Sequence, residues 1–203
     1  MRITVLGASG KTGTEIVKQA LTAGHVVYAV THHGDGFETS PNLHVIVGDA
    51  TDPSIITQAS EDSDVILSVL GAASNKATVM TDATKAVIEA SKLTGCKRFI
   101  LMSSFIVEAS HLKGIVKMGG SMMKGMVKDK STSENQIRSS DLDWTIVYAT
   151  RLTSQPKGSG LRVLSETEKL SLKNKIARAD VAAFMLQVAE QNAYVREEVT
   201  ISQ

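Results

Sequence analysis

The chain has little of the chemistry that builds disulfide-linked, zinc-binding or membrane-spanning proteins. Among its 203 residues there is 1 cysteine, Cys96, which excludes an intramolecular disulfide framework and a cysteine-rich zinc site. Only 3 residues are proline, 21% are charged and 42% are hydrophobic, which favours a buried core over a disordered chain. No apolar run approaches the roughly 18 residues that a membrane-spanning helix requires.

Neither sign of charge prevails. The 22 Lys and Arg against 21 Asp and Glu give a formal net charge of +1, whereas general nucleic-acid binders carry a clear basic excess. Residues 1–6 run directly into a glycine turn, which leaves no room for the apolar region of a signal peptide. We therefore expect a soluble cytoplasmic protein, a monomer or homodimer, with neither nucleic acid nor membrane as a partner and no bound metal.

Short β-branched runs alternate with longer helical patterns, which is typical of βαβ units in a parallel sheet. The expected strands are Ile3–Leu6, Val26–Val30, Leu43–Val47, Asp64–Leu70, Arg98–Met102, Trp144–Tyr148 and Val199–Ser202. We predict one Rossmann-type α/β domain over residues 1–203, a doubly wound parallel sheet with helices on both faces. A small substrate-side region is expected over about residues 148–203.

Apolar residues at helical spacing predict three helices. The first follows the opening strand, and Gly24 lies where a helix end favours positive φ. The second covers about residues 77–91, and the third begins at Asp180, a predicted N-cap. Two segments, 32–41 and 114–130, lack clean periodicity.

Three glycines lie in the segment that joins the first strand to the first helix, Gly7-Ala8-Ser9-Gly10-Lys11-Thr12-Gly13. Glycines at these positions permit a tight turn, close approach of the backbone to a phosphate and close packing of helix on sheet. The amides at the start of the helix then face a pyrophosphate. An ordinary strand–helix turn is the alternative, but the preceding strand, the following helix and the second strand all favour a dinucleotide site.

The spacing G-x-x-G-x-x-G and further motifs resemble the atypical short-chain dehydrogenase/reductases, in the group of NmrA-like proteins and biliverdin reductase B-type flavin reductases. The resemblance runs nearly end to end. It rests on GASGKTG at 7–13, VGDATD at 47–52, ILSVLGA at 66–72, ILMSS at 100–104, SSDLDWTIV at 139–147 and IARADVAAFML at 176–186.

The resemblance implies a role for each matched segment in binding NAD(P). The glycine turn would hold the pyrophosphate, Asp49 and Ala50 would meet the adenine, and the adenosine ribose would be lined by Leu70, Gly71 and Ala72. Asp49 has an alternative role as a loop cap.

At the end of the fifth strand, Ser103 and Ser104 would lie beside the nicotinamide, which agrees with ligand binding at the carboxyl ends of strands. The alternative is a strand end that satisfies its own backbone. Tyr148 completes the predicted cofactor site, and Ser104 is the candidate catalytic residue. Relatives often have Arg-Pro after the sixth strand, where this chain has Tyr148-Ala149.

The residues after the second strand bear on the choice of cofactor. An NAD-specific site uses an acidic residue there, whereas this chain has Thr31, His32 and His33, and the nearest acid is Asp35. Relatives that prefer the phosphorylated cofactor commonly have arginine at the position of Thr31. Lys11 and the two imidazoles can donate to a 2′-phosphate when protonated, although a solvated histidine pair is the alternative. We expect NADPH rather than NADH.

The tyrosine–lysine dyad of carbonyl-reducing relatives is absent. The residues four positions after Tyr28, Tyr148 and Tyr194 are histidine, leucine and glutamate. This disfavours carbonyl reduction and sugar-nucleotide epimerisation by that mechanism. Hydride transfer to a flavin-, quinone- or tetrapyrrole-like aromatic acceptor needs less acid–base help, because the acceptor delocalises the charge and solvent can protonate it.

We therefore predict an NAD(P)H-dependent reductase of such acceptors, in which Ser104 orients the acceptor. Lys130 is either a cationic neighbour of the acceptor or a solvated surface charge, and the sequence favours the second. The alternative function is a non-catalytic NAD(P)-binding redox sensor of the NmrA-like type, which would bind a protein partner.

Overall fold

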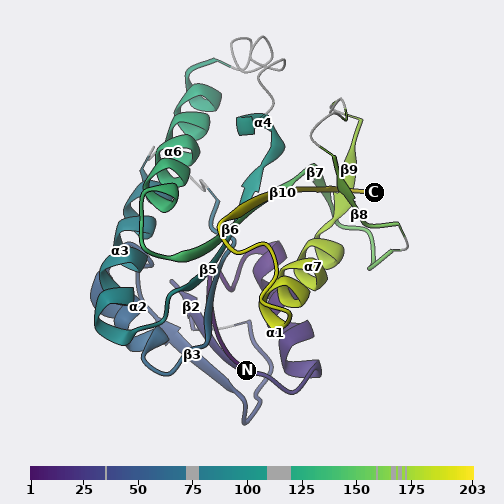
Figure 1. The fold of residues 1–203 in the computed structure, drawn as a ribbon. Coiled ribbons are helices and arrows are strands. Elements are labelled where there is room, and N and C mark those ends of the chain that lie inside the picture. The colour runs from purple at the N-terminus through teal and green to yellow at the C-terminus, as the bar shows by residue number, and fades with distance from the viewer. Residues whose placement is uncertain are drawn as a thin grey trace.

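The centre of the molecule is an eight-stranded sheet with the order β3-β2-β1-β4-β5-β6-β10-β8 (Figure 1). A computed structural model describes residues 1–34, 36–71, 78–108, 120–158, 160–165, 168, 171 and 173–203. Every neighbouring pair of strands is parallel except β8 with β10. The chain reverses direction across the sheet between β1 and β4, and this confirms the predicted Rossmann-type fold.

All seven predicted strands are present, with bounds that differ by no more than two residues. They are β1 Arg2–Leu6, β2 Val26–Thr31, β3 Leu43–Val47, β4 Val65–Ser68, β5 Arg98–Ser104, β6 Asp143–Ala149 and β10 Glu197–Ser202. Sequence patterns missed three strands of three residues each: β7 Arg151–Thr153, β8 Arg162–Leu164 and β9 Lys175–Ala177. Strands β7 and β9 form a separate parallel pair.

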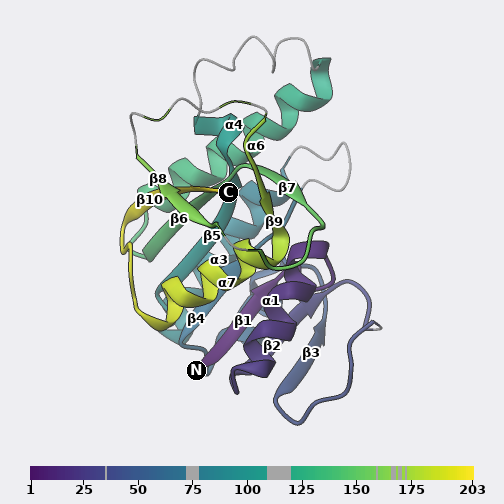
Figure 2. The same cartoon turned by 90° about the vertical axis from the view of Figure 1, so that its right-hand side faces the viewer.

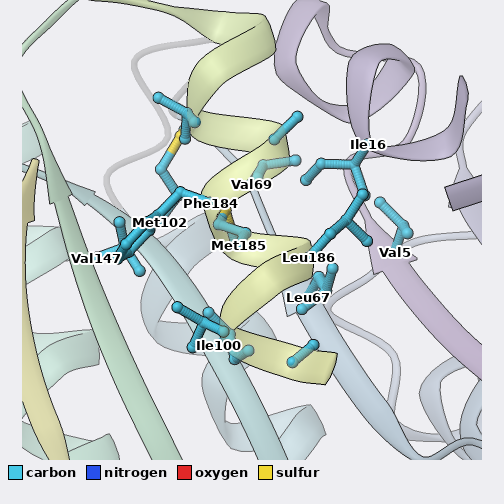
Figure 3. Close-up of a cluster of buried hydrophobic side chains, with 14 of the residues drawn as sticks. Val5, Ile16, Leu67, Val69, Ile100, Met102, Val147, Phe184, Met185 and Leu186 are labelled. Carbon is cyan, nitrogen blue, oxygen red and sulfur yellow. The ribbon is translucent and has the colours of Figure 1, made fainter. Parts of the chain in front are cut away.

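Helices cover both faces of the sheet (Figure 2). On one face lie α1 Lys11–Thr22 and α7 Arg178–Glu190, whose side chains pack on those of β1, β4, β5 and β6 (Figure 3). On the other face lie α2 Pro53–Ser60, α3 Val79–Thr94 and α6 Gly120–Arg138, and the short α4 Phe105–Glu108 follows β5. Within the described residues, no helix has both the length and the apolar character needed to cross a membrane.

Helix α6 overlaps the segment 114–130, which lacks apolar periodicity. Part of the reason is that α6 buries polar side chains beside the apolar Ile137: Asp129, Ser133 and Glu134 have almost no exposed surface. The Asp129 carboxylate accepts hydrogen bonds from the Met80 amide at 3.0 Å and the Thr81 amide at 2.9 Å. It thus caps the N-terminus of the neighbouring helix α3, whose own N-cap residue makes no side-chain cap.

The prediction that Asp180 is an N-cap is wrong. Helix α7 begins at Arg178, because the preceding strand β9 runs directly into it, and its N-cap residue is Ala177. Asp180 is buried in the first turn and accepts hydrogen bonds from the Gly158 amide at 3.1 Å and from Gln203 Nε2 at 2.8 Å. It therefore fixes an adjacent loop and the C-terminus to the helix.

Close packing between the two ends of the glycine turn determines the geometry of the connection from β1 to α1. A Cβ atom at Gly13 would lie 2.1 Å from the Gly7 carbonyl oxygen and 2.8 Å from Ala8 Cα, both backbone atoms. At Gly10 the nearest atom is the Gly7 oxygen, at 3.2 Å. The three glycines are therefore not equivalent, and Gly13 serves packing.

We expect Gly13→Ala to lower the free energy of unfolding by about 1–3 kcal/mol, since the backbone must shift to admit the methyl group. Gly10→Ala is the matched control and should cost less than about 1 kcal/mol. Urea unfolding followed by circular dichroism measures both. Equal losses in the two variants would contradict the assignment.

Candidate functional site

The glycine turn lies at the carboxyl end of β1, between the ends of β2 and β4. Gly7 has φ +80°, and a Cβ atom there would lie 3.3 Å from the Leu70 amide nitrogen, which follows β4. The Ala8 amide donates to the Val30 carbonyl oxygen in β2 at 3.3 Å. The turn, the end of β2 and Leu70 thus come together at the carboxyl edge of the sheet, where Rossmann folds have the crevice that binds dinucleotides.

The N-terminus of α1 fits an anionic ligand. The helix begins at Lys11, its N-cap Gly10 offers no side chain to the first amides, and its first turn contains no acidic residue. Gly10 and Lys11 are exposed, while Thr12 is buried. The unsatisfied amides and the helix dipole favour negative charge at this end, so these residues would hold the pyrophosphate of NAD(P).

The adenosine side of the crevice is built from the ends of β2 and β3. Thr31 is buried, and its hydroxyl donates to Ser9 Oγ at 3.0 Å or to the His33 carbonyl oxygen at 3.1 Å. The Gly48 amide donates to the Thr31 carbonyl oxygen at 2.9 Å. Thr31 points inward, whereas Ser9, Lys11, His32 and His33 are exposed, so these side chains could reach a 2′-phosphate.

The predicted adenine contacts lie just beyond β3. Asp49 is exposed, and its Oδ1 accepts hydrogen bonds from the Thr51 amide at 2.9 Å and the Thr51 hydroxyl at 2.8 Å, so it does act as a loop cap. Ala50 is buried. Gly71 is exposed, and Ala72 lies outside the described residues. The contacts of these residues with adenosine stay predictions.

The two serines at the end of β5 differ in their environment. Ser103 pairs in register with Tyr148 of β6, is buried, and donates a hydrogen bond from Oγ to Glu134 Oε1 at 2.6 Å. Ser104 is only half-buried, and its Oγ accepts a long hydrogen bond of 3.5 Å from the Ile106 amide. Ser104 is therefore the serine that a molecule at the strand ends can reach.

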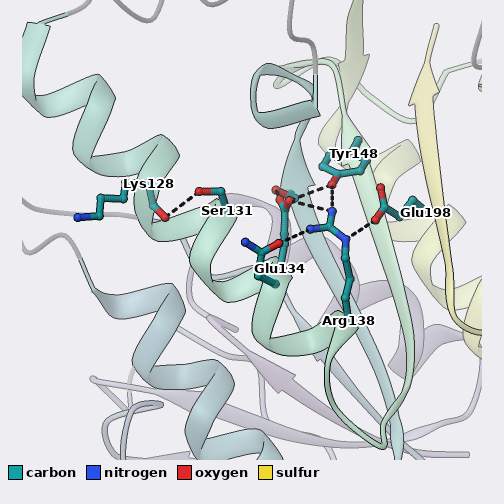
Figure 4. A network of polar contacts seen from close by, with 8 residues as sticks. Lys128, Ser131, Glu134, Arg138, Tyr148 and Glu198 are labelled. Carbon is teal, nitrogen blue, oxygen red and sulfur yellow. Dashed lines mark hydrogen bonds and ion pairs between the residues drawn. The ribbon is translucent and has the colours of Figure 1, made fainter.

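A buried carboxylate, Glu134 of α6, bonds to strands β5 and β6 and is linked through Arg138 to β10 (Figure 4). Besides Ser103, it accepts a hydrogen bond from the Tyr148 hydroxyl at 2.9 Å and pairs with Arg138 Nη2 at 3.4 Å. Arg138 also donates from Nη2 to the Tyr148 oxygen at 3.0 Å and from Nε to Glu198 Oε1 of β10 at 2.6 Å. These charge-assisted bonds compensate for the burial of the carboxylate.

This network determines what Tyr148 can do. Burial and the neighbouring carboxylates Glu134 and Glu198 raise the pKa of Tyr148, so its phenol keeps its proton. The hydroxyl faces α6 and is held by Glu134 and Arg138. The sequence missed both of these partners, because they lie on the polar helix; their i, i+4 spacing was the one available signal.

The other two tyrosines do not lie at the strand ends, although Tyr194 and Tyr148 line one cavity of about 340 Å³ beside β10. Tyr28, within β2, stacks on His44 of β3 with ring centroids 5.0 Å apart. Tyr194 precedes β10 and therefore lies toward the amino edge of the sheet, where its ring centroid is 6.0 Å from that of Phe184. Within the described residues, then, Tyr148 is the one tyrosine at the carboxyl ends of the central strands.

Tyr148 and Ala149, the positions at which relatives often have Arg-Pro, are the last two residues of β6, and strand β7 begins after Thr150. The pairing of β7 with β9 brings Ser154 beside the start of α7, where Arg178 Nη1 donates to Ser154 Oγ at 3.2 Å. A depression of about 180 Å³ separates these two residues from Lys11 and the start of α1. The C-terminal region thus borders the glycine turn.

Lys130 is not a solvated surface charge, which corrects the interpretation that the sequence favoured. It lies on α6 and is half-buried, and desolvation lowers the pKa of its ammonium group. Of the neighbouring methionines, Met126 is half-buried, and Met118 lies outside the described residues.

Solved structures share this fold over the whole chain. A short-chain dehydrogenase/reductase from Veillonella parvula, solved in complex with NADP, superposes with a TM-score of 0.82 at 18% identity and covers 100% of this chain and 94% of its own. ChuY from Escherichia coli O157:H7, described as an anaerobillin reductase, gives a TM-score of 0.76 at 22% identity over 99% of this chain and 96% of its own.

Sequence comparison gives the family. The UPF0659 protein YMR090W of Saccharomyces cerevisiae is 26% identical over 219 aligned residues, which cover 99% of this chain and 92% of the yeast protein. The profile of the NAD(P)H-binding family matches residues 7–192, from the glycine turn to the end of α7. The chain therefore belongs to the NAD(P)H-binding family.

Proposed function

We propose that the protein is an NAD(P)H-dependent reductase that transfers hydride to a flat conjugated acceptor such as a flavin, a quinone or a linear tetrapyrrole. The observation that carries this proposal is the environment of Tyr148. Its hydroxyl is the one phenol at the strand ends, and it is bound to Glu134 instead of facing the crevice. The acceptor must therefore be one that is reduced without an activated tyrosine.

The chain's own residues would bind and orient the reactants. Bound NAD(P)H supplies the hydride, and the amides of Lys11 and Thr12 at the start of α1 would hold its pyrophosphate, since the Gly10 amide already donates to the Gly7 carbonyl oxygen at 3.0 Å. The ends of β4, β5 and β6 form the wall beside the nicotinamide, where Ser104 offers a hydroxyl to orient the acceptor. Holding the two reactants in contact lowers the barrier substantially, and a conjugated acceptor spreads the charge that it receives. The likeness to ChuY supports reductase chemistry in general.

We propose NADPH as the preferred reductant. The described residues directly after β2, His32, His33 and Gly34, include no acid, and Ser9 and His32 are exposed. The Veillonella parvula neighbour, which was solved with NADP, supports the same choice. A protonated imidazole and a serine hydroxyl both donate hydrogen bonds to a phosphate.

The direct test is to mix the protein with NADPH and FMN and to follow the near-ultraviolet absorbance of the reduced nicotinamide. We expect protein-dependent loss of this absorbance. Tight NADPH binding without oxidation by any flavin, quinone or tetrapyrrole would contradict the proposal and would indicate a non-catalytic redox sensor.

Gly10→Val should weaken NADPH binding by about 100-fold or more, because a branched side chain would stand where the backbone approaches the pyrophosphate. Fluorescence titration measures the affinity. Thermal unfolding shows whether the variant folds, which we expect because Gly10 is exposed. A folded variant with the affinity of the wild type would remove the turn from the site.

His32→Asp should shift the preference toward NADH by about tenfold, roughly 1.4 kcal/mol of relative binding free energy. The new carboxylate would repel a 2′-phosphate and accept a hydrogen bond from a free ribose hydroxyl. Dissociation constants for both cofactors, measured for both proteins, provide the test. A wild-type protein that already binds NADH much more tightly would show that the loop is misassigned.

Ser104→Ala should lower turnover with FMN by less than about tenfold, since only orientation is lost and not proton transfer. Tyr148→Phe should also keep turnover within tenfold, but should lower the free energy of unfolding by about 1–3 kcal/mol, because buried Glu134 loses a donor. A loss of turnover above about a thousandfold in either variant, at unchanged NADPH affinity, would assign the proton transfer to that hydroxyl.

A further inference from the structure

Lys130 lies beside the strand ends at which the proposed reaction takes place. It precedes Glu134 by four residues, so the two side chains share one face of α6 and are separated by about one helical turn of 5.4 Å. Glu134 is level with the Ser103–Tyr148 pair of β5 and β6. Because a helix that joins two parallel strands runs antiparallel to them, Lys130 is displaced from this pair toward Ser104 and the carboxyl edge.

The two carboxylates that act on Lys130, those of Glu134 and Asp129, already accept hydrogen bonds from other groups. Glu134 accepts hydrogen bonds from Ser103 and Tyr148, and it also pairs with Arg138. Asp129 caps α3 through the amides of Met80 and Thr81 and also accepts the Thr81 hydroxyl at 2.7 Å. Through the part of the chain that the structure describes, neither a hydrogen bond nor a salt bridge holds the Lys130 ammonium.

The carboxylates near Lys130 raise the pKa of its ammonium group, but by less than desolvation lowers it. Glu134 and Asp129, both on α6, favour the ammonium form, whereas burial disfavours it more strongly and lowers its pKa. Among the described residues, the ionisable groups that act on the Lys130 ammonium are these two carboxylates of α6. A poorly hydrated ammonium with free N–H groups, placed at this edge, is suited to an electron-rich ligand.

We propose that Lys130 is the catalytic residue that donates the proton when the acceptor is reduced, an inference that rests on the proposed function. The acceptor receives a hydride, with its electron pair, from C4 of the reduced nicotinamide. Electrons of the acceptor's π system move to one of its nitrogen or oxygen atoms. That atom bonds the proton as the N–H bond of the ammonium breaks, which leaves a neutral amine that solvent reprotonates.

The reaction balances in atoms, electrons and charge. NADPH loses two electrons and a hydrogen and becomes NADP⁺, and the acceptor gains two electrons, the hydride hydrogen and the proton. The step depends on the ammonium form of Lys130. Turnover should therefore fall as the pH rises through the pKa of this group, which burial brings below that of an exposed lysine.

Three variants on the same helix test the role. Lys130→Met should lower turnover with FMN by about 100-fold or more, with NADPH affinity changed less than about threefold. Lys130→Arg should remain impaired, because a guanidinium keeps the charge but does not release a proton. Lys128→Met is the matched control: Lys128 is exposed, points away from Glu134 in Figure 4, and should be dispensable.

Recovery of turnover in Lys130→Arg, or wild-type turnover in Lys130→Met, would overturn proton donation while leaving the reductase intact. If the wild-type protein fails to oxidise NADPH with every flavin, quinone and tetrapyrrole tried, the proposed function and this inference are overturned together. Loss of NADPH affinity in parallel with turnover in Lys130→Met would also count against the proposal, because it would place Lys130 in cofactor binding.

A second measurement does not depend on turnover. In protein labelled with ¹³C at lysine Cε, the Lys130 resonance is assigned by its absence from Lys130→Arg. It should titrate below the ordinary range of a lysine side chain, because burial lowers its pKa. Titration of Lys130 within that ordinary range would overturn the proposal, whether or not any acceptor is reduced.

Discussion

The buried carboxylate of Glu134 is the interaction on which the arrangement at the strand ends depends. It receives hydrogen bonds from Ser103 of β5 and Tyr148 of β6, and it pairs with Arg138, which reaches Glu198 on β10. A charge in this position is stable only if its lone pairs are used, so the bonds hold α6 at a fixed height on the sheet. They also remove the phenol from the crevice.

The glycine turn imposes the matching constraint at the other end of the crevice. Gly13 packs against the backbone of Gly7 and Ala8 so closely that α1 must start where it does, with uncapped amides at the end of β1. The glycine turn lies beside the reversal of strand order between β1 and β4 and would hold the anionic part of a dinucleotide. The Glu134 network shapes the wall on which the reactive ring of the dinucleotide would lie.

The sequence predicted the longer strands of the sheet well, because buried parallel strands are short β-branched runs that turn residues bound on both sides. It failed where polar groups are buried. Helix α6 packs on α3 through Asp129 and Ser133, so it lacks the apolar stripe that reveals a helix. For the same reason Glu134 escaped notice, and Lys130 was taken for a surface charge. The motifs located the crevice, but which side chains face it depends on contacts between distant segments, as the inward-facing Thr31 shows.

The measurement that tests the central claim most directly is the stereochemistry of hydride transfer. Reduced cofactor carrying deuterium on one or the other face of nicotinamide C4 is oxidised with FMN, and the label that remains in the product is measured by mass spectrometry. A ring held against the ends of β4, β5 and β6 presents a single face. The account predicts that one isomer loses its deuterium and the other retains it. A mixture of labelled and unlabelled product from both isomers would contradict it.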